Sequence, residues 1–292
     1  MSLTRRSFTL LLAMTPGIGG RTVTRVLARN DLLGRSPEDF LRLAPEAKRE
    51  EYRLTLKACE GLNAAPQDLV DRVKAVEERL DKHGVGLVTS ADAHYPRQIE
   101  EMDTAPPGAL FLYGNTRLLG VRTFAVMSSR GTSPAGLDMM DRLCEEGVLA
   151  GDVLVAGENT PEYQRAAIVP LRWGSPRILC LDRGLFTSLG QDLNQEPFRA
   201  ARLWRYEFDE KTDLVVSAFR PDAGFIGINN QVRDRLVACL AARIDFVEIR
   251  PGGNMEKLAR LALKAGRQVR VSDRSVGYRR LLEVGAHPLE GA

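Results

Sequence analysis

The pattern of apolar and polar residues changes character near Gly84. Before this residue, apolar positions recur with helical spacing: Phe8–Met14 forms one apolar helix, and Val70–His83 is amphipathic. Ser36 is followed by a proline and two acids, which is the composition of a helix N-cap and first turn. After Gly84 the apolar runs become short. The pattern therefore predicts a helical domain followed by a domain of another class.

From about Arg122 onward, short apolar strands alternate with helical segments. The predicted strands are Thr123–Met127, Asp152–Ala156, Arg177–Leu181, Asp213–Ala218, Asp245–Ile249 and Gln268–Val271. The clearest helices between them are Leu137–Glu146, Asn229–Ala241 and Met255–Lys264. Such alternation predicts a parallel, doubly wound α/β sheet, which binds ligands at the carboxyl ends of its strands. We expect a helical domain at 1–83 and a Rossmann-like domain at 84–292, with 84–121 as an extension of the latter.

Composition indicates a globular chain that is not a polycation. Its 292 residues are 44% apolar, and 41 basic side chains face 38 acidic ones. The cysteines show no CxxC spacing and the three histidines no ligand spacing, so we expect no disulfide, metal or cofactor. The apolar stretch Phe8–Met14 precedes Thr15-Pro16 rather than a cleavage site, and no run approaches the ~20 apolar residues of a membrane span. We therefore expect a cytoplasmic protein without membrane contact.

A glycine-rich turn lies between two predicted helices near the N-terminus. Gly17, Gly19 and Gly20 precede Arg21, and Thr22–Arg29 follows with helical composition. This is the form of a helix-hairpin-helix, in which backbone amides approach a DNA phosphate without reading bases. A plain connector that needs positive φ angles has the same sequence. Both interpretations stay open.

The most informative segment begins where the first predicted strand of the sheet ends. The strand gives way to small residues and one arginine, and a turn then leads into a helix. Such a connection presents free amides and the positive end of a helix dipole to a ligand, and arginine adds a planar donor fork suited to phosphate. The segment predicts a phosphate-bearing ligand, either a nucleotide or a nucleic-acid backbone. The candidate contacts are Ser128, Ser129, Arg130, Ser133 and Gly136.

A second loop of the same form follows the strand predicted at Asp245–Ile249. Gly252, Gly253 and Asn254 lie between this strand and the helix Met255–Lys264, and they form the sharper of the two glycine loops. A turn and helix start without a ligand is the alternative. Neither loop is a Walker A or GxGxxG motif, so ATPase and dehydrogenase functions are not indicated.

Two further regions carry weaker signals. Gly157 ends a predicted strand, but Glu158–Tyr163 places two acids where an anion site needs glycine and positive charge, which favours an altered loop. Arg233 and Arg235 open a helix and could straddle a phosphate chain or pair with neighbouring acids. The sequence shows no acid–base pair suited to catalysis, so we assign no catalytic residue and expect no enzyme.

In order and spacing, these pieces resemble the DNA-processing protein family DprA, also called Smf, from about residue 8 to 288. The family motif A-[IV]-V-G-[SA]-R-x-x-S-x-x-G is similar to Ala125–Gly136, with serine in place of the first glycine. R-N-R-[IL]-I-A-G-L resembles Arg233–Leu240, and V-V-S-G resembles Leu154–Gly157. A Tyr-Pro pair and a Pro-Pro segment that ends in Leu-Phe-x-x-Gly-Asn115 come before them, as in the family.

The resemblance implies a sterile-alpha-motif-like or helix-hairpin-helix domain, followed by an extended Rossmann domain that binds single-stranded DNA in a basic pocket. It also implies a homodimer that loads the RecA recombinase during natural transformation and DNA recombination. Carried over to this chain, Arg130, Ser133, Arg233 and Arg235 would contact backbone phosphates, and Gly157 would shape the pocket floor.

The chain departs from the family at two loops. The motif G-G-x-A-x-G-I-D-x-x-A-H is largely lost at Gly157–Ala167, and S-G-S-L-x-T-A is replaced by Gly253–Ala259. The chain stops soon after Pro288, so we expect no C-terminal winged helix. The alternative function is a small-nucleotide sensor or phosphoribohydrolase-like enzyme of the same superfamily, because Pro251–Glu256 partly matches P-G-G-x-G-T-x-x-E. A protein-interaction module is a third possibility.

Overall fold

The computed structural model describes residues 3–63 and 66–289 of the chain, which forms two compact units. The first unit comprises Met1–Tyr95 with Ala105–Leu112, and the second comprises Pro96–Thr104 with Tyr113–Ala292. The units therefore interleave in sequence. Residues 84–112, which we expected in the Rossmann-like domain, divide between them.

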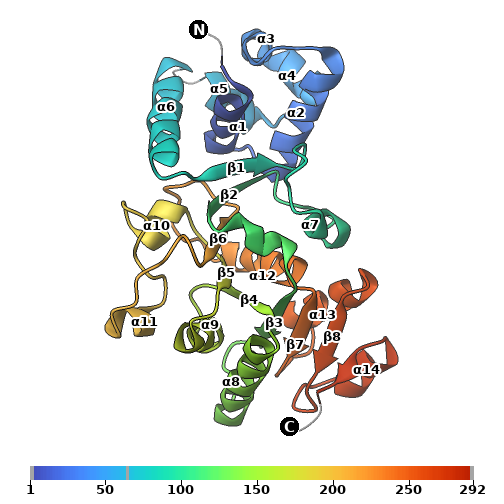
Figure 1. Ribbon diagram of the computed structural model, residues 1–292. Coiled ribbons are helices and arrows are strands. Elements are labelled where there is room, and N and C mark those ends of the chain that lie inside the picture. The colour runs from blue at the N-terminus through green and yellow to red at the C-terminus, as the bar shows by residue number, and fades with distance from the viewer. Residues whose placement is uncertain (1–2, 64–65, 290–292) are drawn as a thin grey trace. The chain divides into compact units, whose positions relative to one another are not determined.

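The first unit consists of helices and one β-hairpin (Figure 1). The hairpin strands run antiparallel, with Gly86 opposite Leu112. Aromatic side chains fill part of the helical core, where Phe40 packs edge-on against Phe8 and Tyr52 at centroid distances of 5.5 and 4.8 Å. Its elements are α1 (Arg5–Met14), α2 (Gly20–Leu33), α3 (Pro37–Arg42), α4 (Pro45–Tyr52), α5 (Leu56–Asn63), α6 (Pro66–Lys82), β1 (Gly86–Thr89) and β2 (Ala109–Gly114).

The second unit contains a parallel sheet with strand order β6-β5-β4-β3-β7-β8-β9. These strands are β3 (Thr123–Met127), β4 (Val153–Gly157), β5 (Arg177–Cys180), β6 (Leu214–Ser217), β7 (Arg243–Phe246), β8 (Gln268–Val271) and β9 (His287–Pro288). The helices are α7 (Arg97–Met102), α8 (Pro134–Leu149), α9 (Pro161–Trp173), α10 (Leu185–Leu189), α11 (Arg199–Leu203), α12 (Asn229–Leu240), α13 (Asn254–Lys264) and α14 (Tyr278–Glu283), with a 3₁₀ turn at Thr116–Gly120.

Helices cover both faces of this sheet. The central strand β4 contacts the packed pair α8 and α9 as well as α12, which packs against α13 (Figure 1). All five residues of β3 and of β4 are buried, as expected for parallel strands covered on both sides. The prediction of an α/β protein with a helical N-terminal part and a mostly parallel sheet is confirmed.

Two segments differ from the sequence-based expectation. Strand β7 covers Arg243–Phe246 rather than Asp245–Ile249, because Phe124 of β3 pairs with Arg243 and fixes the register. The segment Glu158–Tyr163, expected to be a loop, includes the start of α9. Thr160 accepts a hydrogen bond from the Tyr163 N–H and caps this helix, with proline at its first position.

Candidate functional site

A surface hollow lies at the carboxyl edge of the second unit's sheet, beside strands β3 and β7. The chain order reverses there, since β4, β5 and β6 extend to one side of β3 and β7, β8 and β9 to the other. Open α/β sheets bind ligands at such switch points. This switch-point hollow has a volume of about 380 Å³. Of the predicted site residues, Ser128, Ser129, Arg130, Arg233, Gly253 and Asn254 line it.

The N-terminus of α13 opens into the switch-point hollow, which Gly253, Asn254 and Met255 help to line. Gly253 is the N-cap, and among the described residues no side chain caps the helix. Glu256 accepts a hydrogen bond from the Gly252 N–H at 2.7 Å, which lowers the pKa of this carboxyl. The first-turn amides and the helix dipole therefore favour an anion in the hollow.

Two exposed arginines line the hollow beside the α13 terminus. Arg130 follows β3 and Arg250 follows β7, and both side chains reach the switch-point hollow. Ser129 joins their loops, because its hydroxyl accepts a hydrogen bond from the Arg250 N–H at 3.0 Å. The Ser128 hydroxyl likewise accepts from the Glu248 N–H at 3.2 Å. The serines that we expected to contact phosphate thus hold the two arginine-bearing loops together.

The N-terminus of α8 is occupied by the chain's own carboxylates. Ser133 caps this helix by accepting from the Gly136 N–H. The carboxylate of Glu248 accepts from the Ser133 N–H at 3.1 Å and from the Ser133 hydroxyl. Glu162 accepts from the Gly131 N–H at 2.8 Å. The amides that we expected to face a phosphate therefore already have anionic partners.

Gly136 leaves the space that the Glu248 carboxylate fills. A Cβ at this position would lie 2.5 Å from Glu248 Oε1, so any other residue would push the carboxylate away. Gly157 has a similar packing role at the end of β4. A Cβ there would lie 2.6 Å from the Tyr163 ring and 2.8 Å from the Arg233 side chain. Both glycines are required by close approach beneath the surface.

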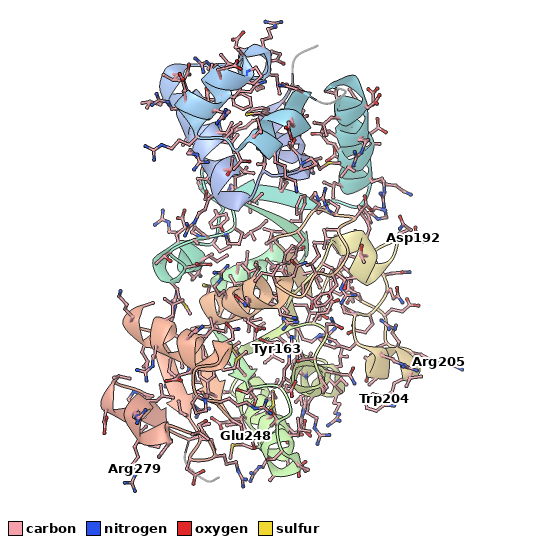
Figure 2. The ribbon with its side chains drawn as sticks, turned by 180° about the vertical axis from the view of Figure 1, so that it is seen from behind. Tyr163, Asp192, Trp204, Arg205, Glu248 and Arg279 are labelled. Atoms are coloured by element: carbon pink, nitrogen blue, oxygen red, sulfur yellow. The ribbon has the colours of Figure 1, made fainter. Side chains whose placement is uncertain are left out.

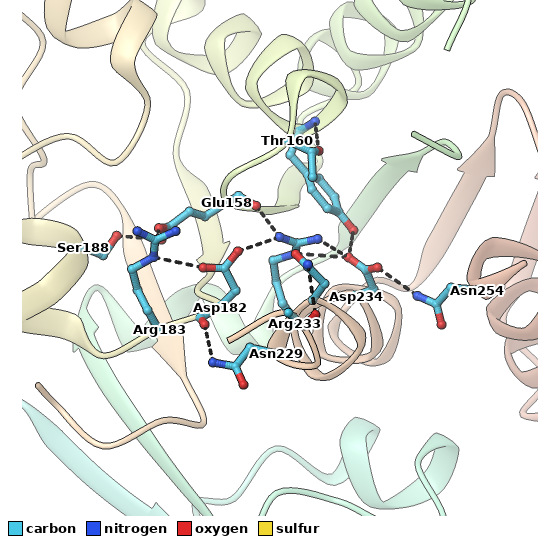
Figure 3. A network of polar contacts seen from close by, with 12 residues as sticks. Glu158, Thr160, Asp182, Arg183, Ser188, Asn229, Arg233, Asp234 and Asn254 are labelled. Atoms are coloured by element: carbon cyan, nitrogen blue, oxygen red, sulfur yellow. Dashed lines mark hydrogen bonds and ion pairs between the residues drawn. The ribbon is translucent and has the colours of Figure 1, made fainter. Parts of the chain in front are cut away.

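Arg233 belongs to a buried ionic network (Figure 3). Its guanidinium donates to Asp182 at 2.8 Å and to Asp234 at 2.9 Å, and it lies 4.9 Å from the centroid of the Tyr163 ring. Asp234 in turn accepts from the Asn254 amide at 2.8 Å. Because Arg233 is only 1% exposed and fully engaged, its role here is to anchor α12 under the hollow. A phosphate contact by Arg233 stays a prediction.

Glu158, which directly follows β4, is part of the same network and links it to Arg183 and Ser188 (Figure 3). Burial raises the pKa of this carboxyl to about 7, while the Ser188 hydroxyl and Arg183 act in the opposite direction. The Ser188 hydroxyl donates to Glu158 at 2.6 Å, and Arg183 lies 2.9 Å away. Glu158 therefore changes its charge near neutral pH.

Arg235, which we predicted to contact phosphate, lies on the side of α12 that packs against α7. Its guanidinium pairs with the buried Asp103 at 3.3 Å. Arg235 is partly buried, and it does not line the switch-point hollow.

The glycine turn of the first unit connects α1 to α2. Gly20 packs against backbone, since a Cβ there would lie 2.4 Å from the Gly108 nitrogen. Gly17 has a φ of 82° and lies against Ala58, whereas Gly19 and Arg21 are exposed. Internal packing thus explains glycine at two of these positions. DNA contact by this turn stays a prediction.

The carboxylates of Glu162 and Glu248 are the site residues that the sequence reasoning missed. Glu248 fell inside the strand predicted at Asp245–Ile249, whereas it follows β7 in the structure. Glu162 was read as part of an altered loop. Their positions could have identified them, because Glu248 follows a strand and Glu162 lies at the start of a helix, both at the carboxyl edge of the sheet. Figure 2 shows Glu248 and Tyr163 well inside the outline of the second unit, whereas Trp204 and Arg205 lie at its periphery.

Within the described residues, no group of three or more His, Cys, Asp or Glu side chains could hold a metal ion. No helix in the described part of the chain is long and apolar enough to cross a bilayer. Cys180 and Cys239 are buried, as the sequence indicated.

Comparison with known proteins identifies relatives of this architecture. Residues 86–169 match the family model of the DNA recombination-mediator protein A. DNA processing protein A (DprA) from Streptococcus pneumoniae shares the fold with a TM-score of 0.70 and 20% identity, over 99% of this chain and 95% of that chain. DNA processing protein A from Helicobacter pylori, whose structure concerns its single-stranded DNA binding mode, has a TM-score of 0.54 and 20% identity over 71% of this chain and 91% of its own.

No curated protein matches this chain. The family model nevertheless covers β3, the loop that carries Arg130, and β4, which are central parts of the site. The fold shared with the two DprA structures extends beyond that segment. Residues 86–169 are therefore similar to the DNA recombination-mediator protein A family, and the fold of the chain is that of the two DprA structures.

Proposed function

We propose that this protein binds single-stranded DNA through backbone phosphates at the switch-point hollow, in DNA processing during recombination. The observation that carries the proposal is the α13 N-terminus, which opens into the hollow beside Arg130 and Arg250. The single-stranded DNA binding described for the Helicobacter pylori protein supports the same ligand.

The geometry suits a phosphate chain rather than individual bases. The first-turn amides of α13 would hold one phosphate, and Arg130 and Arg250 would grip phosphates beside it. Binding of this kind tolerates any base sequence and releases counterions. Its affinity should therefore fall with salt, with a slope of about −0.7 per phosphate contacted.

The same proposal includes binding without catalysis, a homodimer, and RecA as a partner on the bound DNA. These parts rest on the family resemblance. Sedimentation of the purified chain would measure the oligomeric state, and co-sedimentation with RecA and single-stranded DNA would measure the partnership. A monomer at every concentration would contradict the dimer.

Titration of fluorescently labelled oligo-dT tests the DNA proposal at about 50 and about 200 mM salt. We expect Arg130→Ala and Arg250→Ala each to weaken binding about tenfold at the lower salt, the equivalent of about 1.4 kcal/mol. Arg279→Ala is the matched control, because Arg279 is an exposed arginine on α14 that does not line the switch-point hollow. Equal losses in all three variants, or an affinity independent of salt, would contradict the proposal.

A small nucleotide is the second candidate. The volume of about 380 Å³ falls within the range of small-molecule sites, and one helix N-terminus can hold a single phosphate group. A mononucleotide that raises the melting temperature, together with an oligonucleotide that leaves it unchanged, would favour this function.

A further inference from the structure

A segment rich in arginine and aromatic residues lies at the periphery of the second unit, at Arg199–Tyr206 (Figure 2). It comprises α11 and the three residues that follow it. Its arginines are Arg199, Arg202 and Arg205, and Trp204 and Tyr206 alternate with them. Trp204 is 57% exposed and Tyr206 is 36% exposed, although large aromatic side chains usually bury their rings. We call this the basic-aromatic segment.

The segment is anchored rather than loose. Phe198 and Ala201 are buried on the inner side of α11. The Arg202 guanidinium donates to the backbone carbonyls of Glu196 and Pro197, at 2.7 and 3.1 Å. These contacts hold the backbone that carries the exposed rings, so the chain loses less conformational entropy when a ligand stacks on them.

Arg205 occupies a backbone position that normally takes glycine. Its φ of 63° lies in the left-handed region, and its N–H donates to the Arg202 carbonyl at 2.9 Å. The Tyr206 N–H donates to the Ala201 carbonyl at 3.1 Å, which closes the end of α11. Glycine is the usual residue at such a helix end, and strained non-glycine residues cluster at functional sites.

A row of neighbouring hollows, here called the groove, extends from the switch-point hollow to the basic-aromatic segment, and Trp204 is exposed without lining any of these four hollows. A second hollow of about 580 Å³ shares Arg130 and Thr160 with the first. A third, of about 460 Å³, shares Thr160 with the second and is also lined by Arg199 and Arg202. A fourth, of about 580 Å³, shares Arg202 with the third and is lined by Arg205 and Tyr206.

Acidic and basic side chains line different hollows at the far end of this groove. Asp192 and Glu207 also line the fourth hollow, and they would repel phosphates there. Arg199 and Arg202, which line the third hollow, offer the favourable path for a backbone. A strand that follows the arginines would bring its bases to Tyr206, which lines the fourth hollow, and to the exposed Trp204, two positions before it in the chain.

We propose that the basic-aromatic segment is a second subsite for single-stranded DNA, in which bases stack on Trp204 and Tyr206 while Arg199, Arg202 and Arg205 face the backbone. The proposal rests on the proposed DNA-binding function and extends it from phosphate contacts to base contacts. Exposed aromatic rings next to cationic side chains are the combination that binds single strands without sequence preference.

Intrinsic fluorescence tests the stacking directly, because the chain holds two tryptophans and Trp173→Phe leaves Trp204 as the single emitter. We expect oligo-dT of about 30 nucleotides, longer than the ~4–16 that a single-strand-binding OB-fold covers, to quench this emission. An abasic strand of equal length should bind the protein, as measured by anisotropy of its own label, and leave the emission unchanged. Anisotropy of labelled oligo-dT reports binding independently of Trp204.

The outcomes separate the two proposals. Oligo-dT that binds by anisotropy without quenching Trp204, or equal quenching by the abasic strand, would overturn the stacking subsite and leave the DNA-binding function standing. No binding of oligo-dT by anisotropy would overturn both. A change of oligomeric state in Trp204→Ala with unchanged DNA affinity would also overturn the subsite, because it would assign the rings to contact between copies of the chain.

Length dependence and one backbone variant complete the test. Trp204→Ala should weaken binding of the ~30-nucleotide strand about tenfold, and binding of a ~6-nucleotide strand less than twofold, whereas Arg130→Ala weakens both. Arg205→Gly relieves the left-handed backbone position while it removes a cation. We expect an unchanged or higher melting temperature with about threefold weaker binding of the long strand. Full affinity in Arg205→Gly and Trp204→Ala would overturn the proposal.

Discussion

Two helices of the second unit begin directly after strands at the same edge of its sheet, yet their N-termini differ in what they face. The α8 terminus is capped by Ser133 and faces the carboxylate of Glu248. The α13 terminus begins at Gly253 without a side-chain cap among the described residues, and it faces a hollow lined by two exposed arginines, Arg130 and Arg250. Both loops suggest an anion site in sequence, but only one of them is open to an external anion.

The difference arises from tertiary contacts rather than from the loops themselves. A helix N-terminus attracts any anion, and a carboxylate of the same chain satisfies it as a phosphate would. Glu248 lies 115 positions from the Ser133 amide that it contacts, so no local sequence pattern predicts this contact. A phosphate-like loop therefore indicates a ligand only where the fold leaves the amides of the first helical turn without an internal anion. At α13 the internal carboxylate of Glu256 accepts from the Gly252 N–H, which precedes that turn.

The largest effect on oligo-dT affinity should come from a substitution that gives the α13 N-terminus an internal carboxylate, as the α8 N-terminus has in Glu248. Gly253→Asp places a carboxylate at the N-cap, where aspartate stabilises a helix and competes with phosphate. Gly253 has a φ of −78°, which any residue adopts. We expect oligo-dT affinity to fall about 10- to 100-fold while the melting temperature stays equal or rises.

Gly253→Asn is the matched control for charge, because asparagine caps the helix without an anion. Titration of both variants with the same labelled strand isolates the electrostatic part of the loss. If Gly253→Asn weakens binding as much as Gly253→Asp, steric blockage rather than charge explains the result, and the comparison between the two helix termini fails.

A smaller effect should come from making α8 resemble α13. Glu248→Gln removes the carboxylate charge that the Ser133 amide and hydroxyl face, and we expect the free energy of unfolding to fall by about 1–2 kcal/mol. The variant should also bind oligo-dT about threefold more tightly, since one negative charge near the groove is gone. Chemical denaturation and titration measure the two effects.

Glu283→Gln serves as the control for Glu248→Gln, because Glu283 is an exposed acid of α14. It should leave the free energy of unfolding and the free energy of oligo-dT binding within about 0.5 kcal/mol of the parent protein's values. Unchanged stability in Glu248→Gln would mean that this carboxylate does not satisfy the α8 terminus.

The fold was predictable where burial makes strands apolar, and not where buried ion pairs replace apolar residues. The predicted bounds of β3 and β8 agree with the structure. Strand β7 was displaced, because it contains Arg243 and Asp245, both buried and 3.3 Å apart. Arg270 also pairs with Asp245, at 2.7 Å. A strand stabilised by such pairs lacks the apolar run on which the prediction depended.

The site was predictable in its location and only partly in its contacts. Parallel alternation places the loops after β3 and β7 at one edge, and both loops do line the switch-point hollow. The surroundings of Arg130 and Arg233 depend on burial, which the Ser-Arg and Arg-Asp-Arg patterns of the sequence do not encode. Arg130 is exposed, whereas Arg233 is closed in by Asp182 and Asp234.

The pH dependence of binding should sharpen the comparison, because the third hollow of the groove contains an acid that titrates near neutrality. Burial raises the pKa of Glu158 to about 7, and Glu158 is surrounded by Arg183, Asp182, Arg233 and Ser188. Below this pH the carboxyl is neutral, and above it a negative charge appears beside the path of the phosphates. Affinity for oligo-dT should therefore fall about threefold between about pH 6 and 8.

Glu158→Gln should remove most of this pH dependence and keep the higher affinity at both pH values. Titration of parent and variant at equal ionic strength measures the difference. If the affinity of the variant falls with pH as much as that of the parent protein, another group causes the pH dependence and the charge of Glu158 does not affect DNA binding.

The smallest effect on oligo-dT affinity should come from Arg235, although it stands only two positions from Arg233 on α12. The Arg235 guanidinium pairs with Asp103 at 3.3 Å on the side of α12 that packs against α7. Its charge acts on the hollow only at long range, where salt screens it. Arg235→Ala should therefore change oligo-dT affinity less than twofold, against about tenfold for Arg130→Ala. A tenfold loss in Arg235→Ala with an unchanged melting temperature would mean that DNA also contacts the α7 side of α12, and that the open α13 terminus is not the centre of the site.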